Sequence, residues 1–176
     1  MCFNTHKNTT LLTMSTFSIR PIQKEDNARV AQLIREVLVE HGVPKVGTAY
    51  EDAALDCMFE TYKQERATYF VVVDNSQIIG GAGIAPLANY NGNVCELQKM
   101  YFLDQARGRG IGAQMINTCI KEAQNYNYDG CYLETMPYMN AAQKLYERVG
   151  FTYVDGPMGN TGHYSCPVHM YKILQQ

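Results

Sequence analysis

The most constraining feature of this chain is a glycine-rich turn between an apolar segment and a helical pattern. Residues 97–116 read LQKMYFLDQARGRGIGAQMI, and glycines occupy positions 108, 110 and 112. Glycine adopts backbone conformations that a Cβ atom forbids, and it lets a ligand approach the main chain closely. The first N–H groups of a helix lack intrahelical partners and lie at the positive end of its dipole. The turn therefore predicts an anion-binding helix start, to which Arg107 and Arg109 add positive charge.

Other phosphate-binding patterns fit this turn less well. The Walker A pattern GxxxxGK[ST] is absent from the sequence. A dinucleotide site fits locally, because Gly108, Gly110 and Ala113 match GxGxx[GA] after an apolar segment, and Glu134 closes the next predicted strand. The turn lies in the second half of the chain, however, and no helix separates the last two predicted strands for a parallel crossover. A doubly wound sheet is therefore a poor match.

The periodicity of apolar residues predicts a single α/β domain over 15–176, after a disordered leader over 1–14. A helix is expected over 23–42, with Asp26 as N-cap and Gly42 as the stop. The predicted order is β-α-α-β-β-β-α-β-α-β-β, and no repeat or linker divides it. The other helices are expected over 51–64, 110–130 and 138–150, and the strands over 16–22, 67–74, 77–87, 94–103, 131–136, 151–156 and 166–174.

Charge and composition argue against several classes of function. The formal net charge is −2 and the 15 basic residues are scattered, so no nucleic-acid partner is expected. No apolar run approaches the roughly 18 residues of a transmembrane helix, so no membrane partner is expected. The six cysteines show neither a CxxC motif nor a short-spaced Cys/His cluster. This pattern favours reduced thiols in a cytoplasmic protein and gives no support for a metal.

Two motifs together connect the chain with a known family. Arg107, Gly110 and Gly112 match [QR]xxGx[GA], and NAAQKLYERVGF follows at 140–151. The pair resembles the GNAT superfamily of acetyl-CoA-dependent N-acetyltransferases, and the element order matches over 17–174. The resemblance implies a single-domain GNAT fold of the α/β (α+β) class, with a mixed, mostly antiparallel sheet of about seven strands and about four flanking helices. It also implies a splay between strands 4 and 5, acetyl-CoA as cosubstrate and no metal. Dimers are common in the family, so a homodimer is one expected assembly.

The resemblance assigns the cofactor to the turn and to the strand before it. Met100 and Phe102 resemble the residues whose backbones bind the pantetheine arm and the acetyl carbonyl, and Leu103 lies at the splay. Plain strand core is the alternative for the side chains of Met100 and Phe102. Asn140 resembles the asparagine that reaches the cofactor arm. The backbone amides implied to hold the pyrophosphate are those of Arg107, Gly108, Arg109, Gly110, Ile111, Gly112 and Ala113.

Direct acetyl transfer to an amine needs a base for the ammonium and a proton donor for the leaving thiolate. Tyr146 resembles the family's general acid, with a core tyrosine as the alternative. Glu96 lies where several members carry a base or a water-binding carboxylate. Strand alternation places Glu96 on the face of Gln98 and Met100, where partial desolvation would make it a better base. General base, amine anchor and solvated strand residue all remain open for Glu96.

The acceptor is expected to bind on loops. His41, Tyr50, His163 and Tyr164 are candidate substrate-binding residues, with inert surface positions as the alternative. Cys166 is rejected as a nucleophile, because no His-Asp pattern supports it and the family generally transfers directly. The expected acceptor is a primary amine of a small molecule, such as an amino acid, a polyamine or an amino-bearing antibiotic. A non-catalytic acyl-CoA-binding module and an acetyltransferase for protein N-termini or lysines are the alternatives.

Overall fold

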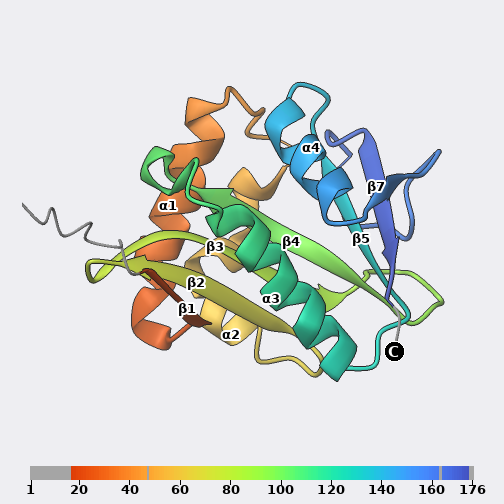
Figure 1. Ribbon diagram of the computed structural model, residues 1–176, viewed down its shortest axis with the longest axis horizontal. Helices are drawn as coiled ribbons and strands as arrows, with labels where there is room; N and C mark the ends of the chain where they lie inside the picture. The colour runs from red at the N-terminus through yellow and green to blue at the C-terminus, as the bar shows by residue number, and fades with distance from the viewer. Residues whose placement is uncertain (1–16, 47, 163, 175–176) are drawn as a thin grey trace, which may run out of the picture.

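One sheet organises the molecule, and a computed structural model describes it over residues 17–46, 48–162 and 164–174 (Figure 1). Its strands are β1 (Phe17–Pro21), β2 (Thr68–Asp74), β3 (Gln77–Pro86), β4 (Val94–Phe102), β5 (Gly130–Thr135), β6 (Thr152–Tyr153) and β7 (Val168–Ile173). Their order is β1-β2-β3-β4-β5-β7-β6, and only β4 and β5 run parallel. The predicted mixed, mostly antiparallel sheet is confirmed; the expected leader over 1–14 lies outside the described residues.

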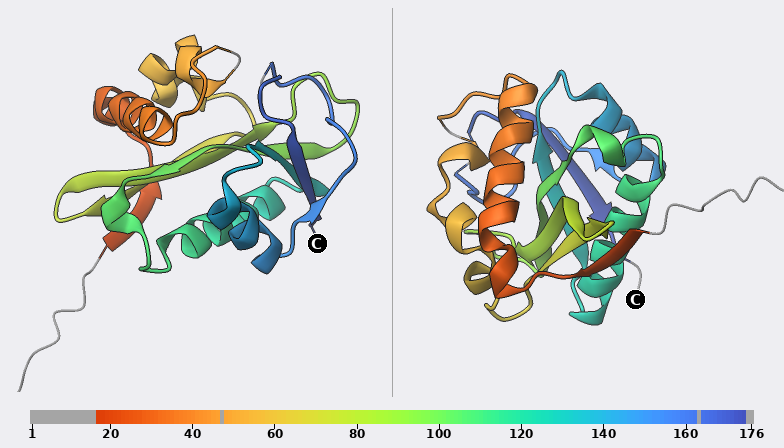
Figure 2. Two further views of the ribbon diagram at one scale, coloured as in Figure 1. Left: turned by 90° about the horizontal axis from the view of Figure 1, so that it is seen from above. Right: turned by 90° about the vertical axis from the view of Figure 1, so that its left-hand side faces the viewer.

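Helices cover both faces of this sheet and enclose two apolar layers (Figure 2). Along β2, Val71 packs in the layer on one face and Val72 in the layer on the other, as the period-2 alternation of a strand requires. No helix in the described part of the chain is long and apolar enough to cross a membrane. The helices on the face of Val71 are α1 (Asn27–Glu40) and α2 (Met58–Thr61). Those on the face of Val72 are α3 (Ile111–Asn125) and α4 (Asn140–Arg148).

The start of α1 differs from the prediction. Asp26 immediately precedes the helix but makes no capping hydrogen bond to it. Its carboxylate instead accepts from the Arg20 guanidinium at 2.6 and 3.0 Å and from the Gln23 N–H at 2.8 Å. The charged partner outcompetes the helix amides for the same oxygens. At the other end, Gly42 has a φ of +62°, consistent with its predicted role as the stop.

The second predicted helix, over 51–64, is wrong for most of its length. The chain forms short 3₁₀ turns at Ala49–Glu51 and Ala53–Cys57, and only Met58–Thr61 is α-helical. Cys57 interrupts the helical path with φ −139° and ψ 45°. The Asn27 side chain then accepts a hydrogen bond from the Phe59 N–H at 2.8 Å, which anchors the short α2 to the start of α1.

The parallel strands β4 and β5 stay together for only three residues. Val94–Glu96 pair with Gly130–Tyr132, after which β5 pairs with β7 alone and β4 with β3 alone. The two strands therefore diverge in the middle of the sheet, which Figure 1 shows between their labels. This is the predicted splay. Because β4 has no strand partner on that side after Glu96, every second backbone N–H and C=O along this edge faces the gap.

Candidate active site

A bulge in β4 decides which side chains face each layer of the molecule. Lys99 has a φ of +50°, and the register with β3 shifts at this point. Before the bulge, Leu97 packs in the layer under α3; after it, Met100 also packs there, although an offset of three positions would place the two on opposite faces of a regular strand. Tyr101 packs in the opposite layer under α1. The prediction that Met100 shares a face with Glu96 is therefore wrong, because the inserted residue inverts the alternation.

Glu96 lies on the α1 side of the sheet and is held by a short chain of hydrogen bonds. Its side chain is buried, with 3% of the residue exposed. The Gln98 amide nitrogen donates to Glu96 Oε2 at 2.6 Å, and the Tyr62 hydroxyl donates to Gln98 Oε1 at 2.8 Å. Burial raises the pKa of Tyr62 well above its ordinary value, so this hydroxyl remains a donor. Glu96 is thus a fixed carboxylate rather than a solvated strand residue.

Tyr146 approaches the splay from the opposite side, on α4. It is 7% exposed and packs edge-on against Phe151, with ring centroids 6.0 Å apart. Burial raises the pKa of Tyr146 to about 12. No hydrogen bond to its hydroxyl is found within the described ranges, although the residue lines the pocket at the splay. Its phenol is therefore neutral and able to donate to a group that enters the pocket.

The pocket itself lies where β4 and β5 separate. Cys166, on the loop before β7, closes one side of it. Burial, followed by the charges of Glu134 and Glu96, raises the pKa of the Cys166 thiol to about 11, so the thiolate that a nucleophile requires is disfavoured. The lining residues are Leu38, Val43, Thr48, Ala49, Glu96, Leu97, Gln98, Lys99, Met100, Tyr101, Glu134, Thr135, Met136, Met139, Tyr146 and Cys166.

The glycine turn leaves a set of backbone donors at the start of α3. The Arg107 N–H donates to Asp104 O at 2.9 Å, and the next backbone bond is from Gln114 N–H to Gly110 O at 3.2 Å. The helix has no side-chain cap. These amides, at the positive end of the helix dipole, fit an anion such as a pyrophosphate. Five amides lie between Arg107 and Gln114 that donate no backbone hydrogen bond to any described residue: those of Gly108, Gly110, Ile111, Gly112 and Ala113.

The three glycines of the turn serve different purposes. Gly108 and Gly110 have φ values of +72° and +73°, the left-handed region that favours glycine, and a Cβ added to either would meet nothing within 4 Å. Gly112 is helical, but a Cβ there would lie 2.8 Å from Leu145 Cδ2 on α4 and 3.8 Å from Met100 Cε. The first two permit the turn, whereas Gly112 permits close packing of α3 against α4 beside the pocket.

The two arginine side chains of the turn are directed elsewhere. The Arg109 guanidinium donates to Asp74 Oδ2 at 2.6 Å, at the end of β2. Arg107 is half exposed and pairs with Glu40 at 3.1 Å and with Asp104. Its Nη2 also lies 3.1 Å from His41 Nε2. The predicted reach of these guanidinium groups toward a phosphate would require both to leave carboxylate partners, so the amides are the better-placed donors.

The remaining cofactor candidates surround the gap. The Phe102 ring lies directly over Gly80 on β3, so its side chain is strand core. The Leu103 N–H donates to Ile79 O at 2.9 Å and ends the pairing of β4 with β3. Asn140 is the exposed first residue of α4, with Nδ2 at 3.4 Å from Tyr138 O. Met100 alone among these side chains lines the pocket.

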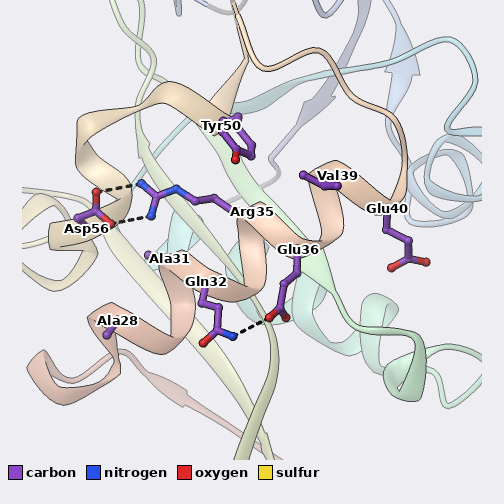
Figure 3. Close-up of a pocket in the computed structure, with 9 residues that line it drawn as sticks. All are labelled: Ala28, Ala31, Gln32, Arg35, Glu36, Val39, Glu40, Tyr50 and Asp56. Carbon is purple, nitrogen blue, oxygen red and sulfur yellow. Dashed lines mark hydrogen bonds and ion pairs between the residues drawn. The ribbon is translucent and has the colours of Figure 1, made fainter.

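Of the four predicted substrate-binding residues, the three that the structure describes do not line the pocket. His41 lies beside Arg107, near the glycine turn. Tyr50 lines an open groove on the outer face of α1, where Arg35 binds Asp56 with bonds of 2.7 and 2.9 Å (Figure 3). Tyr164 is 78% exposed, and His163 lies outside the described residues.

Two features of the pocket were missed by the sequence analysis. Lys99 is an ordinary lysine in sequence, yet its ammonium lies 2.7 Å from Asp52 Oδ2 with only 8% of the side chain exposed. Glu134 accepts from the Tyr132 hydroxyl at 2.9 Å and from Thr161 Oγ1 at 2.7 Å. In the sequence, Glu134 enters only the dinucleotide interpretation, as the residue that closes the strand after the glycine turn. The signal available in the sequence was its position near the end of the strand predicted over 131–136.

No group of three or more His, Cys, Asp or Glu side chains gathers as a metal site would in the described part of the chain.

Solved structures show where the fold recurs. An acetyltransferase of the GNAT family from Staphylococcus aureus Mu50 superposes with a TM-score of 0.80 at 20% identity, over 91% of this chain and all of that one. The yncA protein of Salmonella typhimurium, solved with its cofactor acetyl-CoA, superposes with a TM-score of 0.72 at 16% identity, over 91% of this chain and 95% of that one.

Sequence relatives establish the family. The chain is 37% identical over 157 residues to the N-acetyltransferase YjgM of Escherichia coli (strain K12), which covers 89% of this chain and 94% of that protein. It is 31% identical over 128 residues to the N-acetylaspartate synthetase of Rattus norvegicus, which covers 70% of this chain and 41% of that protein. The model of the acetyltransferase (GNAT) family matches residues 32–151. The splayed sheet and its glycine turn are therefore those of an N-acetyltransferase, and this chain belongs to the acetyltransferase (GNAT) family.

Proposed function

We propose that this protein transfers the acetyl group of acetyl-CoA directly to a primary amine of a small molecule. One relationship carries the proposal: the amides at the start of α3 and the pocket holding Glu96 and Tyr146 meet at the same splay. Met100 joins them, since it lines the pocket and approaches Gly112 in the first turn of α3. A ligand with a pyrophosphate at one end and a reactive group at the other would fit this arrangement.

In this proposal acetyl-CoA supplies the thioester, and the chain binds it at three places. The amides of Gly108 through Ala113 hold the pyrophosphate, as the absence of a side-chain cap on α3 supports. The unpaired edge of β4 around Met100 and Phe102 offers backbone groups to the pantetheine arm and the acetyl carbonyl. Asn140, at the start of α4, is available to the same arm.

The acid–base roles follow from the two sides of the sheet. Glu96 faces the α1 side and takes the proton of the ammonium, either directly or through water, so that the amine nitrogen can attack the carbonyl carbon. The carbon–sulfur bond then breaks, the nitrogen gives its second proton to the departing thiolate or to water, and Tyr146 donates a hydrogen bond to the departing sulfur. A phenol with a pKa of about 12 is a weaker acid than an ordinary thiol. Tyr146 therefore contributes chiefly a hydrogen bond to the developing thiolate.

A panel of amines tests the proposal. The purified protein is incubated with acetyl-CoA and each amine, free thiol is measured, and mass spectrometry detects the acetylated product. Thiol release with a matched N-acetyl product supports the proposal. Binding of acetyl-CoA without turnover of any amine would instead favour a non-catalytic binding module, and turnover restricted to peptides would favour a protein acetyltransferase.

Aspartate belongs in the panel as the second candidate acceptor. The rat relative is named for N-acetylaspartate synthesis, which makes the same reaction a specific alternative here. The pocket charge opposes it. Among the described lining residues the single cation is Lys99, and Asp52 already neutralises it. An acceptor with two carboxylates would meet Glu96 and Glu134 instead.

A further inference from the structure

Glu134 is a carboxylate of the acceptor pocket for which the acetyl-transfer chemistry has no use. Its two oxygens accept from neutral hydroxyls, Tyr132 at 2.9 Å and Thr161 at 2.7 Å. Within 17–46, 48–162 and 164–174, no Lys, Arg or His nitrogen lies within 4.0 Å of it. Hydroxyl donors orient a carboxylate without bringing a positive charge to it, and the cross-strand partner of Glu134, His169, lies beyond ion-pair distance. Glu134 therefore presents a fixed negative charge to whatever enters the pocket.

The sheet register sets Glu134 and Glu96 on the same face, on either side of the splay. Glu96 is the register partner of Tyr132 across the parallel pair, and Glu134 is two residues further along β5. Residues two apart on a strand share a face, so Tyr132 and Glu134 both lie on the side of Glu96. The charges of both carboxylates contribute to the raised pKa of Cys166, as expected if both face the same space.

The spacing of the two carboxylates suits a substrate with two positive groups. Their Cα atoms lie at least roughly 8 Å apart, from a strand separation of about 4.8 Å where the pairing ends and a rise of about 3.3 Å per residue along β5. The nitrogens of a diamine with four methylenes are separated by about 6 Å from standard bond lengths. Such a molecule has the length to place one amine near Glu96 and the other near Glu134.

We propose that the acceptor is a diamine or polyamine whose second ammonium group binds Glu134, while the amine to be acetylated lies at Glu96. This inference rests on the proposed acetyltransferase function and adds the chemical class of its acceptor. Glu134 is then a specificity-determining residue: it contributes affinity for the second charge and takes no part in breaking the thioester.

The competing role for Glu134 is that of a loop anchor through Thr161. Two variants separate these roles. Glu134→Gln keeps the shape of the side chain and removes its charge, whereas Thr161→Val removes the loop contact and keeps the charge. The probes are 1,4-diaminobutane and butylamine, which share a carbon chain and differ in the second amine. Loss of one charged hydrogen bond corresponds to a change of about 10- to 100-fold.

We expect the wild-type protein to acetylate 1,4-diaminobutane with a kcat/KM at least 10-fold above that for butylamine. Glu134→Gln should lower kcat/KM for the diamine by about 10- to 100-fold, mainly through KM, and change that for butylamine by less than about twofold. Thr161→Val should affect both amines alike. Equal losses for both amines in Glu134→Gln, or a wild-type preference for butylamine or aspartate, would overturn the inference.

A binding measurement keeps this test separate from that of the proposed function. If the wild-type protein acetylates no amine, the proposed function fails, but calorimetry in the presence of coenzyme A still reports whether 1,4-diaminobutane binds. Binding that Glu134→Gln weakens by about 10-fold or more supports the inference. Absence of binding, or binding that the variant leaves unchanged, overturns it.

Discussion

The Gln98 amide links Tyr62 and Glu96 in one direction: the Tyr62 hydroxyl donates to Gln98 Oε1 at 2.8 Å, and Gln98 Nε2 donates to Glu96 Oε2 at 2.6 Å. Because the raised pKa of Tyr62 keeps its hydroxyl protonated, it holds the amide oxygen on its own side. The amide nitrogen is therefore left for Glu96. The orientation of the proposed base depends on a residue that lies in the layer under α1.

Gln98→Leu should lower kcat for amine acetylation by about 10-fold, because Glu96 loses the donor that orients it. The Kd for acetyl-CoA should stay within about twofold, since this contact lies on the α1 side of the sheet, away from the amides of α3. Steady-state kinetics and calorimetry measure the two quantities. Tyr62→Phe serves as the milder control, because it removes only the outer hydrogen bond of the chain. An unchanged kcat in Gln98→Leu would show that Gln98 does not position Glu96.

Tyr146→Phe should lower kcat by about 100-fold and leave the Kd for acetyl-CoA within about twofold, because only the donor to the departing sulfur is removed. Tyr153→Phe is the matched control: Tyr153 is half exposed, donates to Gln143 at 3.0 Å and does not line the pocket. Thiol release gives kcat and calorimetry gives the Kd. Full turnover in Tyr146→Phe would remove Tyr146 from the mechanism.

The free energy of unfolding should fall as the pH rises above 10. Burial raises the pKa of Tyr146 to about 12 and raises those of Tyr62 and Tyr69 as well. The unfolded chain releases these phenolic protons near pH 10, whereas the folded protein retains them. The stabilisation is thus complete below pH 10 and is lost progressively toward pH 12, by up to about 1.4 kcal/mol per pH unit for each such tyrosine.

Urea unfolding at pH 8, 10 and 11 measures this dependence. Tyr146→Phe should reduce the slope above pH 10, because one of the linked protons has been removed. A free energy of unfolding that does not change between pH 8 and 11 would contradict the raised pKa values of the buried tyrosines.

The sequence predicted those parts of the molecule that local patterns encode. Apolar periodicity located the strands and three of the helices, and the glycine spacing located the start of α3, because each signal lies within one segment. The bulge at Lys99 has no such signal, since left-handed backbone is usually occupied by glycine or asparagine. The face of Met100 was consequently wrong. The approach of Glu134 to Glu96 depends on the register of β4 and β5, which are separated by a whole helix.

The start of α3 can be tested with a pair of isosteric substitutions at Gly110. A Cβ there meets open space, and asparagine and aspartate both tolerate its φ of +73° better than other residues. Gly110→Asp and Gly110→Asn therefore differ chiefly in charge. If the amides bind a pyrophosphate, the aspartate variant should raise the Kd for coenzyme A by at least about 10-fold relative to the asparagine variant. The difference should shrink as salt is added, because the charges are partly exposed.

Gly112→Ala should give the opposite pattern. Its Cβ would lie 2.8 Å from Leu145 Cδ2, so either the end of the Leu145 side chain or α4 itself must shift, and a shift of α4 displaces Tyr146. We expect a fall in kcat of about 10-fold or more with a smaller change in the Kd for coenzyme A, because misplacement of a catalytic group by about 1 Å is costly. Calorimetry and thiol release distinguish the two glycines.

For the Gly110 pair, equal Kd values for coenzyme A in the aspartate and asparagine variants, at low salt, would show that the anion binds elsewhere.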